Sequence, residues 1–152
     1  MYVAELCTRN VVTVRPDDEI ALAARRMRET HVGYLVVLES GVPAGTIPRV
    51  IGVLTDRDIV VEVVAQDADP RHVLVRDVMT RQPVVLEGFA TLPAAMQEMR
   101  RVSVRRMPVV GKQGELLGVL SLDDALDVLS GELASLAGAI RNERRVESML
   151  RD

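Results

Sequence analysis

Aromatic residues are scarce in this sequence: Phe, Tyr and Trp together make up 2% of 152 residues, and Trp is absent. A core must therefore be built from Val, Leu, Ile, Ala and Met. The scarcity also argues against a surface that stacks nucleic-acid bases, because such a surface needs exposed aromatic rings. A formal net charge of −3 provides no general electrostatic attraction to DNA, RNA or an anionic membrane. We therefore expect no nucleic-acid or membrane partner.

Cysteine and long apolar runs are also lacking. Cys7 is the only cysteine, so an internal disulfide is impossible and nothing indicates an oxidising compartment. Glu5 interrupts the short apolar opening, which is unlike a secretory signal. The apolar runs stay far below the roughly 18 residues that a membrane span needs. The expected location is the cytoplasm.

Residues that carry common catalytic or metal chemistry are not grouped along the chain. The two histidines, His31 and His72, are far apart and have no Cys or carboxylate partner at ligand spacing, so we expect no metal site. No Ser-His-Asp pattern, Gly-rich phosphate loop or Cys-x-x-Cys pair is present. The sequence therefore predicts a protein that is not an enzyme and requires no cofactor.

What the sequence does contain is an internal repeat. Val3 falls on Val75 at an offset of 72, and the match keeps register through a strand, a helix and a second strand. The next loop is six residues longer in the first copy, so that Gly52–Leu54 falls on Gly118–Leu120 at an offset of 66. The repeat predicts two β-α-β-β-α units. We place them at residues 1–70 and 71–131, followed by a helical tail at 132–152.

Local patterns predict where the helices of each unit begin and end. Asp17 or Asp18 is expected to cap the first helix, and Thr91 is expected to cap its counterpart in the second copy. Ser130–Gly131 is expected to end the closing helix of the second copy. The tail then carries a short apolar stripe of Leu133, Leu136 and Ile140. Contact with a second copy of the chain is the first expectation for it, and docking of another partner or a solvated end are the alternatives.

Each copy has a strand that ends in a hydroxyl residue, with an acid three positions later: Thr55 and Asp58, then Ser121 and Asp124. At a helix start, the hydroxyl and the unpaired N–H groups can donate to a phosphate. The carboxylate can accept from both hydroxyls of a ribose. The same spacing is also that of a helix capping box, in which the two side chains bond only to the backbone. The two interpretations are compatible, and both stay open at this point.

The order and duplication of the motifs resemble a tandem pair of CBS (cystathionine-beta-synthase) domains, the arrangement called a Bateman module. The resemblance covers about residues 1–130 and rests on four stretches: Gly52–Asp58, Asp77–Thr80, Arg105–Val110 and Gly118–Asp124. It implies an α/β (α+β) fold of two lobes, packed through their sheets about a pseudo-two-fold axis, with two clefts between them. It also implies homodimers and adenosine-containing ligands: AMP, ADP or ATP, and less often NAD or S-adenosylmethionine.

The resemblance also assigns residues to the clefts. It implies ligand contacts in both copies of the motif: Thr55, Asp58, Ser121 and Asp124. It places a phosphate-binding pair at Arg105 and Arg106, although neighbouring residues at a strand start point opposite ways, which would let only one face the cleft. Arg57 is a further phosphate candidate, and the first copy has no basic pair at the matching place, so the clefts should be unequal. Candidates to hold the base lie near the first strand of each copy: Val12 and Thr13, or Val84 and Val85, with Met107 or Tyr34 as packing partners.

The function predicted from these features is that of a regulatory module. It would bind an adenine nucleotide between its lobes, form a homodimer and act on a separate protein partner. The alternative is a structural or protein-interaction CBS dimer in which Thr55 and Ser121 only cap helices and no nucleotide binds.

Overall fold

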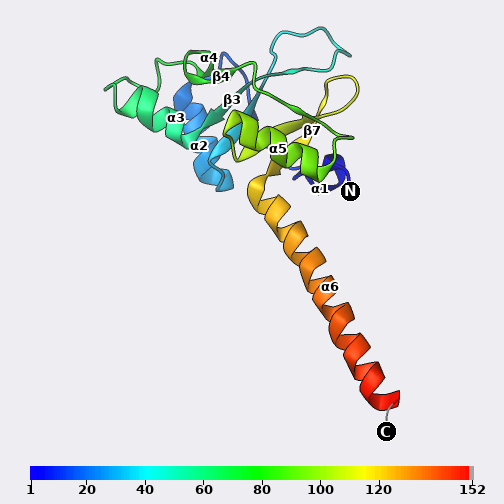
Figure 1. The fold of residues 1–152 in the computed structure, drawn as a ribbon. Helices are drawn as coiled ribbons and strands as arrows, with labels where there is room; N and C mark the ends of the chain where they lie inside the picture. Colours follow the sequence, from blue (N-terminus) through cyan, green and yellow to red (C-terminus); the bar gives the residue numbers. More distant parts are fainter. Residues whose placement is uncertain (151–152) are drawn as a thin grey trace.

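The computed structural model describes residues 1–150, with side chains as far as residue 143. The predicted tail at 132–152 therefore extends beyond the described residues. Within them, the chain forms two small mixed sheets, each covered by helices, and one long helix that projects from the body (Figure 1). This is the mixed α/β architecture that the repeat predicts.

The first lobe is built on a four-stranded sheet. Its strands are, in spatial order, β1 (Thr13–Val14), β2 (Tyr34–Leu38), β3 (Val50–Thr55) and β4 (Thr80–Arg81). The β1 strand is parallel to β2, and the other neighbours are antiparallel. Its helical segments are α2 (Ile20–Thr30), α3 (Asp56–Ile59), the π-helical turn η1 (Val60–Val64) and α4 (Val75–Val78).

The second lobe is built on a three-stranded sheet with the same register. Its strands are β5 (Leu86–Glu87), β6 (Arg106–Val110) and β7 (Leu116–Ser121). Its helices are α1 (Val3–Leu6), α5 (Leu92–Val102) and α6 (Leu122–Leu150). Tyr34 lies opposite Thr55 in the first sheet, as Arg106 lies opposite Ser121 in the second. The register also shifts at the equivalent place in both sheets, between residues 37 and 38 and between residues 109 and 110. The structural repeat confirms the repeat in the sequence.

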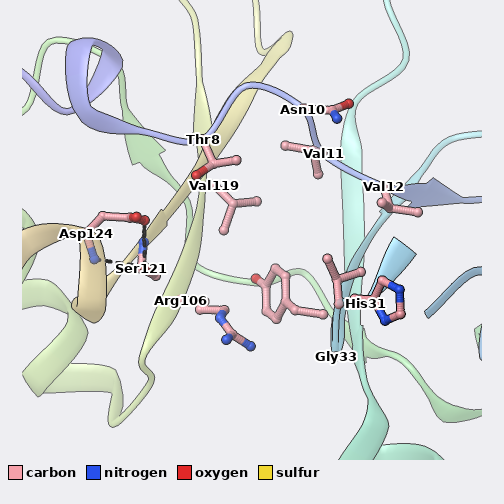
Figure 2. Close-up of a pocket in the computed structure, with 12 residues that line it drawn as sticks. Thr8, Asn10, Val11, Val12, His31, Gly33, Arg106, Val119, Ser121 and Asp124 are labelled. Carbon is pink, nitrogen blue, oxygen red and sulfur yellow. Dashed lines mark hydrogen bonds between the residues drawn. The ribbon is translucent and has the colours of Figure 1, made fainter. Parts of the chain in front are cut away.

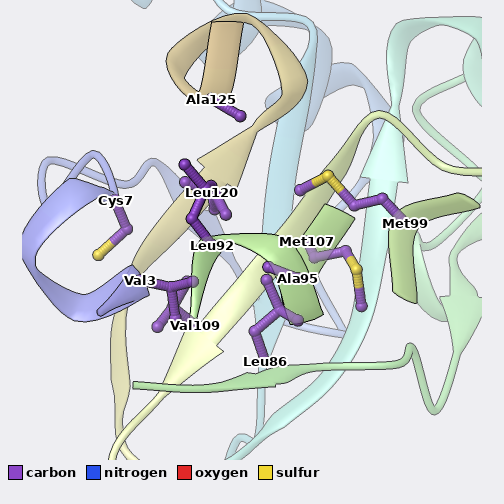
Figure 3. Packing of buried hydrophobic residues seen from close by; sticks show 10 residues of the cluster. All are labelled: Val3, Cys7, Leu86, Leu92, Ala95, Met99, Met107, Val109, Leu120 and Ala125. Atoms are coloured by element: carbon purple, nitrogen blue, oxygen red, sulfur yellow. The ribbon is translucent and has the colours of Figure 1, made fainter. Parts of the chain in front are cut away.

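The two lobes exchange their leading segments. Helix α1, from the N-terminus, packs into the second lobe, where Val3 is fully buried with Leu86 and Leu120 (Figure 3). Helix α4, which precedes the second copy, packs into the first lobe, where Val75 is fully buried. Each sequence unit therefore completes the core of the other. The boundaries at 70/71 and 131/132 stay predictions about the sequence units.

Backbone hydrogen bonds fix both exchanged segments in matching ways. The Thr8 N–H donates to the Val119 carbonyl at 2.9 Å, and the Val119 N–H donates back to Thr8 at 3.0 Å. In the other lobe, Thr80 pairs with Val53 in the β3–β4 ladder. These pairs are equivalent under the repeat. They place the start of each copy beside the Gly-Val-Leu strand of the other copy, where the clefts lie.

Helix capping differs from the prediction at α2 and agrees with it at α5. The cap residue of α2 is Glu19, with no side-chain cap, so the prediction of Asp17 or Asp18 was wrong. The first N–H groups of α2 donate to backbone carbonyls of residues 70 and 73, while Asp18 accepts from the Arg15 N–H and Asp17 pairs with Arg76. Thr91 does cap α5, accepting the Ala94 N–H at 3.4 Å.

The closing helix does not end at Ser130–Gly131. Helix α6 continues without interruption from Leu122 to Leu150, so this prediction was wrong. An exposed glycine inside a helix costs about 1 kcal/mol relative to alanine. Good helix formers surround Gly131, and a single penalty of that size does not stop the helix. Among residues 1–150, no helix combines the length and the apolar character that crossing a membrane requires.

Candidate functional site

A cleft between the two lobes, here called the Ser121 cleft, is lined from both sides. Figure 2 shows Ser121 and Asp124 of the second lobe facing His31 and Gly33 of the first. The connecting chain at residues 10–12 crosses between them. The cavity measures about 230 Å³. Its lining consists of 12 residues: Thr8, Asn10, Val11, Val12, His31, Val32, Gly33, Tyr34, Arg106, Val119, Ser121 and Asp124.

A second inter-lobe cleft, here called the Thr55 cleft, is the repeat counterpart of the first. Every residue that lines the Ser121 cleft has its repeat equivalent in the lining of the Thr55 cleft. These equivalents are Thr80, Gln82, Pro83, Val84, Ser103, Val104, Arg105, Arg106, Tyr34, Val53, Thr55 and Asp58. Gly33, Asp56, Arg57, Val102 and Pro108 also line this cleft, and its cavity is larger, at about 690 Å³.

The motif residues of both clefts form reciprocal hydrogen bonds at the start of a helix. The Thr55 N–H donates to Asp58 Oδ2 at 2.8 Å, and the Asp58 N–H donates to Thr55 Oγ1 at 3.1 Å. The corresponding distances in the second copy, between Ser121 and Asp124, are 3.0 and 3.1 Å. The capping interpretation is therefore correct for both motifs. All of these bonds to carboxylate use Oδ2, so capping and ligand contact through Oδ1 are compatible.

The two hydroxyls differ in what they donate to. Ser121 Oγ donates to Asp124 Oδ2 at 2.5 Å, so its proton is committed inside the motif. Thr55 Oγ1 accepts the Asp58 N–H, and its own proton stays available to donate into the cleft. The Thr55 motif therefore offers a ligand one more hydroxyl donor than the Ser121 motif does.

The Thr55 cleft is richer in arginine than the Ser121 cleft, with three arginines beside Asp56 and Asp58, compared with Arg106 beside Asp124. Arg57, Arg105 and Arg106 all line the Thr55 cleft, whereas only Arg106 among the arginines lines the Ser121 cleft. Arg105 and Arg106 both reach the Thr55 cleft because Arg105 precedes β6, so the alternation of strand side chains does not apply to the pair. Arg105 also lies 3.6 Å from Asp123, in an exposed ion pair that contributes little to stability. The unequal clefts expected from the sequence are present in the charge distribution.

Tyr34 lines both clefts at the point where the lobes meet. Burial raises the pKa of its phenol well above the ordinary value of 10.0, and the nearby positive charge of Arg106 opposes this effect only in part. The phenol therefore stays protonated across the neutral and mildly alkaline range. In that state it can both donate and accept a hydrogen bond.

This raised pKa predicts how the protein responds to alkali. The unfolded chain loses the phenolic proton near pH 10, before the folded chain does, so stability should fall as pH rises above about 10. A Tyr2→Phe variant leaves Tyr34 as the only tyrosine, which allows phenolate absorbance to be assigned to it. We expect no phenolate near pH 10 while circular dichroism still reports the native fold. Phenolate formation at that pH in folded protein would contradict the raised pKa of Tyr34, whose side chain is half-buried where the lobes meet.

Three of the residues predicted to contact the base line neither cleft: Thr13, Val85 and Met107. Met107 is 1% exposed and packs in the core of the second lobe, because its side chain points to the opposite face of β6 from Arg106 (Figure 3). Thr13 lies in β1, at the edge of the first sheet, paired with Val36. Val12, Val84 and Tyr34 do line a cleft, as do all the predicted motif acids, hydroxyls and arginines.

Several lining residues were missed in the sequence. His31 and Ser103 hold left-handed backbone conformations, with φ of 57° and 56°, at the ends of α2 and α5. Asn10 and Gln82 follow the exchanged segments. Each pair is related by the offset of 72 residues, so a search for equivalent polar residues along the repeat would have found them. Within the described residues, no group of three His, Cys, Asp or Glu side chains could hold a metal ion.

Comparison with known proteins identifies the family. A family model for the CBS domain matches residues 3–65 and 75–131, which are the two structural repeats. The chain belongs to the CBS domain family. It is a tandem CBS pair, in which each matched segment forms most of one lobe and contributes its leading residues to the other lobe.

Relatives of this CBS pair differ in length. It is 35% identical to the CBS domain-containing protein YhcV of Bacillus subtilis, over 89% of this chain and 91% of that protein. It is 32% identical to the uncharacterized protein MK0525 of Methanopyrus kandleri, over 83% of this chain but 61% of the relative. It is also 32% identical to an inosine-5'-monophosphate dehydrogenase of Korarchaeum cryptofilum, over 76% of this chain and only 22% of that enzyme.

Solved structures share the arrangement of the pair. The CBS domain protein PAE2072 from Pyrobaculum aerophilum, solved in complex with AMP, has a TM-score of 0.71 and 29% identity, covering 82% of this chain and 89% of that one. A hexameric CBS-CP12 protein from bloom-forming cyanobacteria has a TM-score of 0.70 and 28% identity, covering 83% and 69% of the two chains. One relative of this fold thus binds AMP, and another forms a hexamer.

Proposed function

We propose that this CBS pair is a non-catalytic regulatory module that binds an adenine nucleotide, with the Thr55 cleft as its tighter site. The observation that carries the proposal is the concentration of phosphate-binding groups in that cleft: Arg57, Arg105, Arg106 and the Thr55 hydroxyl. Arginine is well suited to phosphate because its planar guanidinium can form two parallel hydrogen bonds. The AMP complex of PAE2072 supports the ligand class.

The size of the clefts supports the same choice. Pockets that enclose ligands the size of a drug or cofactor usually measure about 300–1,000 Å³. The Thr55 cleft, at about 690 Å³, lies within that range, whereas the Ser121 cleft, at about 230 Å³, lies below it. On size alone, the Thr55 cleft is therefore the better candidate for a nucleotide.

The chemical roles follow from the groups available. Asp58 accepts the ribose hydroxyls through Oδ1, since Oδ2 is held by the Thr55 N–H. The arginines and the Thr55 hydroxyl bind the phosphates. Apolar side chains beside β4 and at the end of α5, among them Val84 and Val104, contact the base. Both are exposed, at 39% and 40%. In the Ser121 cleft, Val12, Ser121 and Asp124 have the equivalent places.

Regulation would come from a difference in affinity between two arrangements of the lobes. A nucleotide that contacts both lobes stabilises the arrangement in which its contacts are complete, and it shifts the population by that difference alone. A separate protein partner that prefers one arrangement would then respond to nucleotide concentration. The CBS pair would act as a homodimer. The alternative is a structural CBS dimer in which both motifs serve only as caps.

A ligand panel separates these two functions. We expect AMP, ADP or ATP, at about one hundred times its dissociation constant, to add about 2.7 kcal/mol to the free energy of unfolding. For a chain of this size, that increase raises the unfolding temperature by roughly 5–10 °C. NAD, S-adenosylmethionine and GTP complete the panel and test the adenine preference. If no member shifts the transition at millimolar concentration, the structural alternative is correct.

A further inference from the structure

The part of α6 beyond the second lobe presents an apolar stripe to solvent. The helix has 29 residues and is therefore about 43 Å long, and it projects away from the body (Figure 1). Four large side chains along its length are more than half exposed: Leu126 at 54%, Leu133 at 66%, Leu136 at 64% and Ile140 at 54%. A helix whose packing does not cover its apolar face is marginally stable in water, so this face needs a partner.

The spacing of the stripe is that of a two-helix coiled coil. Apolar residues occupy every a and d position of a heptad from residue 122 to residue 140: Leu122, Leu126, Leu129, Leu133, Leu136 and Ile140. Leu129 packs partly against the second lobe, and the positions after it extend into solvent. Helices with this 3.5-residue spacing pack side chains of one into gaps of the other. Ser130, Ala137 and Ala139 flank the stripe and are small enough to allow close approach.

The charge along α6 identifies the orientation of the partner helix. Residues 122–140 carry four acids (Asp123, Asp124, Asp127 and Glu132) and no Lys or Arg. Residues 141–150, the last part of α6, carry three arginines (Arg141, Arg144 and Arg145) among two acids. Two parallel copies would place the acidic part of each helix beside the acidic part of the other. Two antiparallel copies place the acidic part of each beside the arginines of the other, and also oppose the helix dipoles favourably.

We propose that α6 is a self-association helix, and that its stripe pairs with the same stripe of a second copy of this chain in an antiparallel coiled coil. The occupant is a second copy because the stripe and the charge pattern are each complementary to themselves after a half-turn. In the register that places a positions against d positions, Leu133 meets Leu136 of the partner and Leu129 meets Ile140 of the partner. This pairing is independent of nucleotide binding.

The first test measures the mass of the full-length chain by light scattering. A Leu133→Glu/Leu136→Glu variant should halve the mass of the wild-type assembly. The matched control, Ala134→Glu/Ser135→Glu, adds the same charge on the face away from the stripe and should keep the wild-type mass. Both variants should keep the unfolding temperature of the lobes and the response to nucleotides. A monomeric wild-type chain, or a stripe variant with unchanged mass, would overturn the proposal and leave the stripe to another partner.

The second test determines the orientation by disulfide cross-linking. In an antiparallel pair, Ile140→Cys alone should give no cross-linked dimer under oxidation, because the two copies of position 140 are far apart. Leu129→Cys/Ile140→Cys should cross-link efficiently between copies. The unmodified chain, whose Cys7 is buried, is the control for background oxidation. Cross-linking of the Ile140→Cys single variant would show parallel helices and contradict the proposed orientation.

Discussion

Replacing Asp58 with asparagine should weaken adenine-nucleotide binding by roughly 10- to 150-fold while the chain stays folded. Asparagine keeps an oxygen that can accept the Thr55 N–H, which is now bonded to Asp58 at 2.8 Å, so the helix cap survives. It removes the charge and replaces one acceptor with a donor that a ribose diol does not need. Hydrogen bonds to charged groups contribute about 1.5–3 kcal/mol, which corresponds to that loss of affinity.

The matched control is the repeat-equivalent substitution, Asp124→Asn. It makes the same chemical change in the Ser121 cleft, which is smaller and has Arg106 as its only arginine. The dissociation constant at the tighter site should not change. Calorimetric titration of both variants measures the effect, and thermal unfolding without ligand checks that both are folded. Equal weakening by the two substitutions, or none by Asp58→Asn, would contradict the assignment of the Thr55 cleft.

Replacing Gly118 with alanine should destabilise the protein by about 1–3 kcal/mol, the usual cost of overpacking a close contact. A Cβ at this position would lie 2.6 Å from Cys7 Sγ and 2.7 Å from the Thr8 carbonyl oxygen. The contact cannot relax easily, because Thr8 is held by two backbone hydrogen bonds to Val119. The exchanged N-terminal segment must move away from β7, and the burial of Val3 in the second lobe is lost with it.

Gly131→Ala is the control, and it should have the opposite sign. A Cβ at Gly131, on α6, meets nothing within 4 Å. Alanine there should stabilise the helix by about 0.5–1 kcal/mol, because glycine loses more backbone entropy on folding. Urea unfolding of the two variants gives both values. If Gly118→Ala were as stable as the wild type, the close approach of the N-terminal segment to β7 would be wrong.

The repeat made much of the fold predictable. Periodicity within each copy gave the strands at residues 34–38 and 116–120, and Thr91 was identified as a cap because its hydroxyl acts within one helical turn. The paired motifs at Thr55 and Ser121 were found for the same reason, since a capping box spans only four residues. Each of these features depends on residues a few positions apart, so the local sequence is sufficient to predict it.

The features that were missed depend on distant parts of the chain. The first N–H groups of α2 are satisfied by carbonyls some 50 residues away, at 70 and 73, so no local pattern could replace Asp17 or Asp18 as the cap. The repeat aligned Val3 with Val75, but the alignment does not determine which of the two lobes each segment packs into. Both Thr13 and Met107 lie on strands, where the choice between core and cleft depends on the register of the neighbouring strand.

The long α6 helix shows a further limit of local interpretation. Ser130–Gly131 is a plausible helix end on its own, because glycine commonly terminates helices. The heptad pattern from Leu122 to Ile140 passes through it, however, and the helix follows the longer pattern. A search for apolar spacing across the expected boundary, instead of within each unit, would have predicted the continuous helix.

Binding of an adenine nucleotide to the Thr55 cleft is tested most directly by calorimetric titration of the full chain with AMP, ADP and ATP. We expect saturable binding at one nucleotide per chain for the tighter site, with affinity that falls as salt concentration rises, because Arg57, Arg105 and Arg106 line the cleft. Absence of binding by all three nucleotides up to millimolar concentration would contradict a nucleotide-sensing function and leave the two motifs as helix caps.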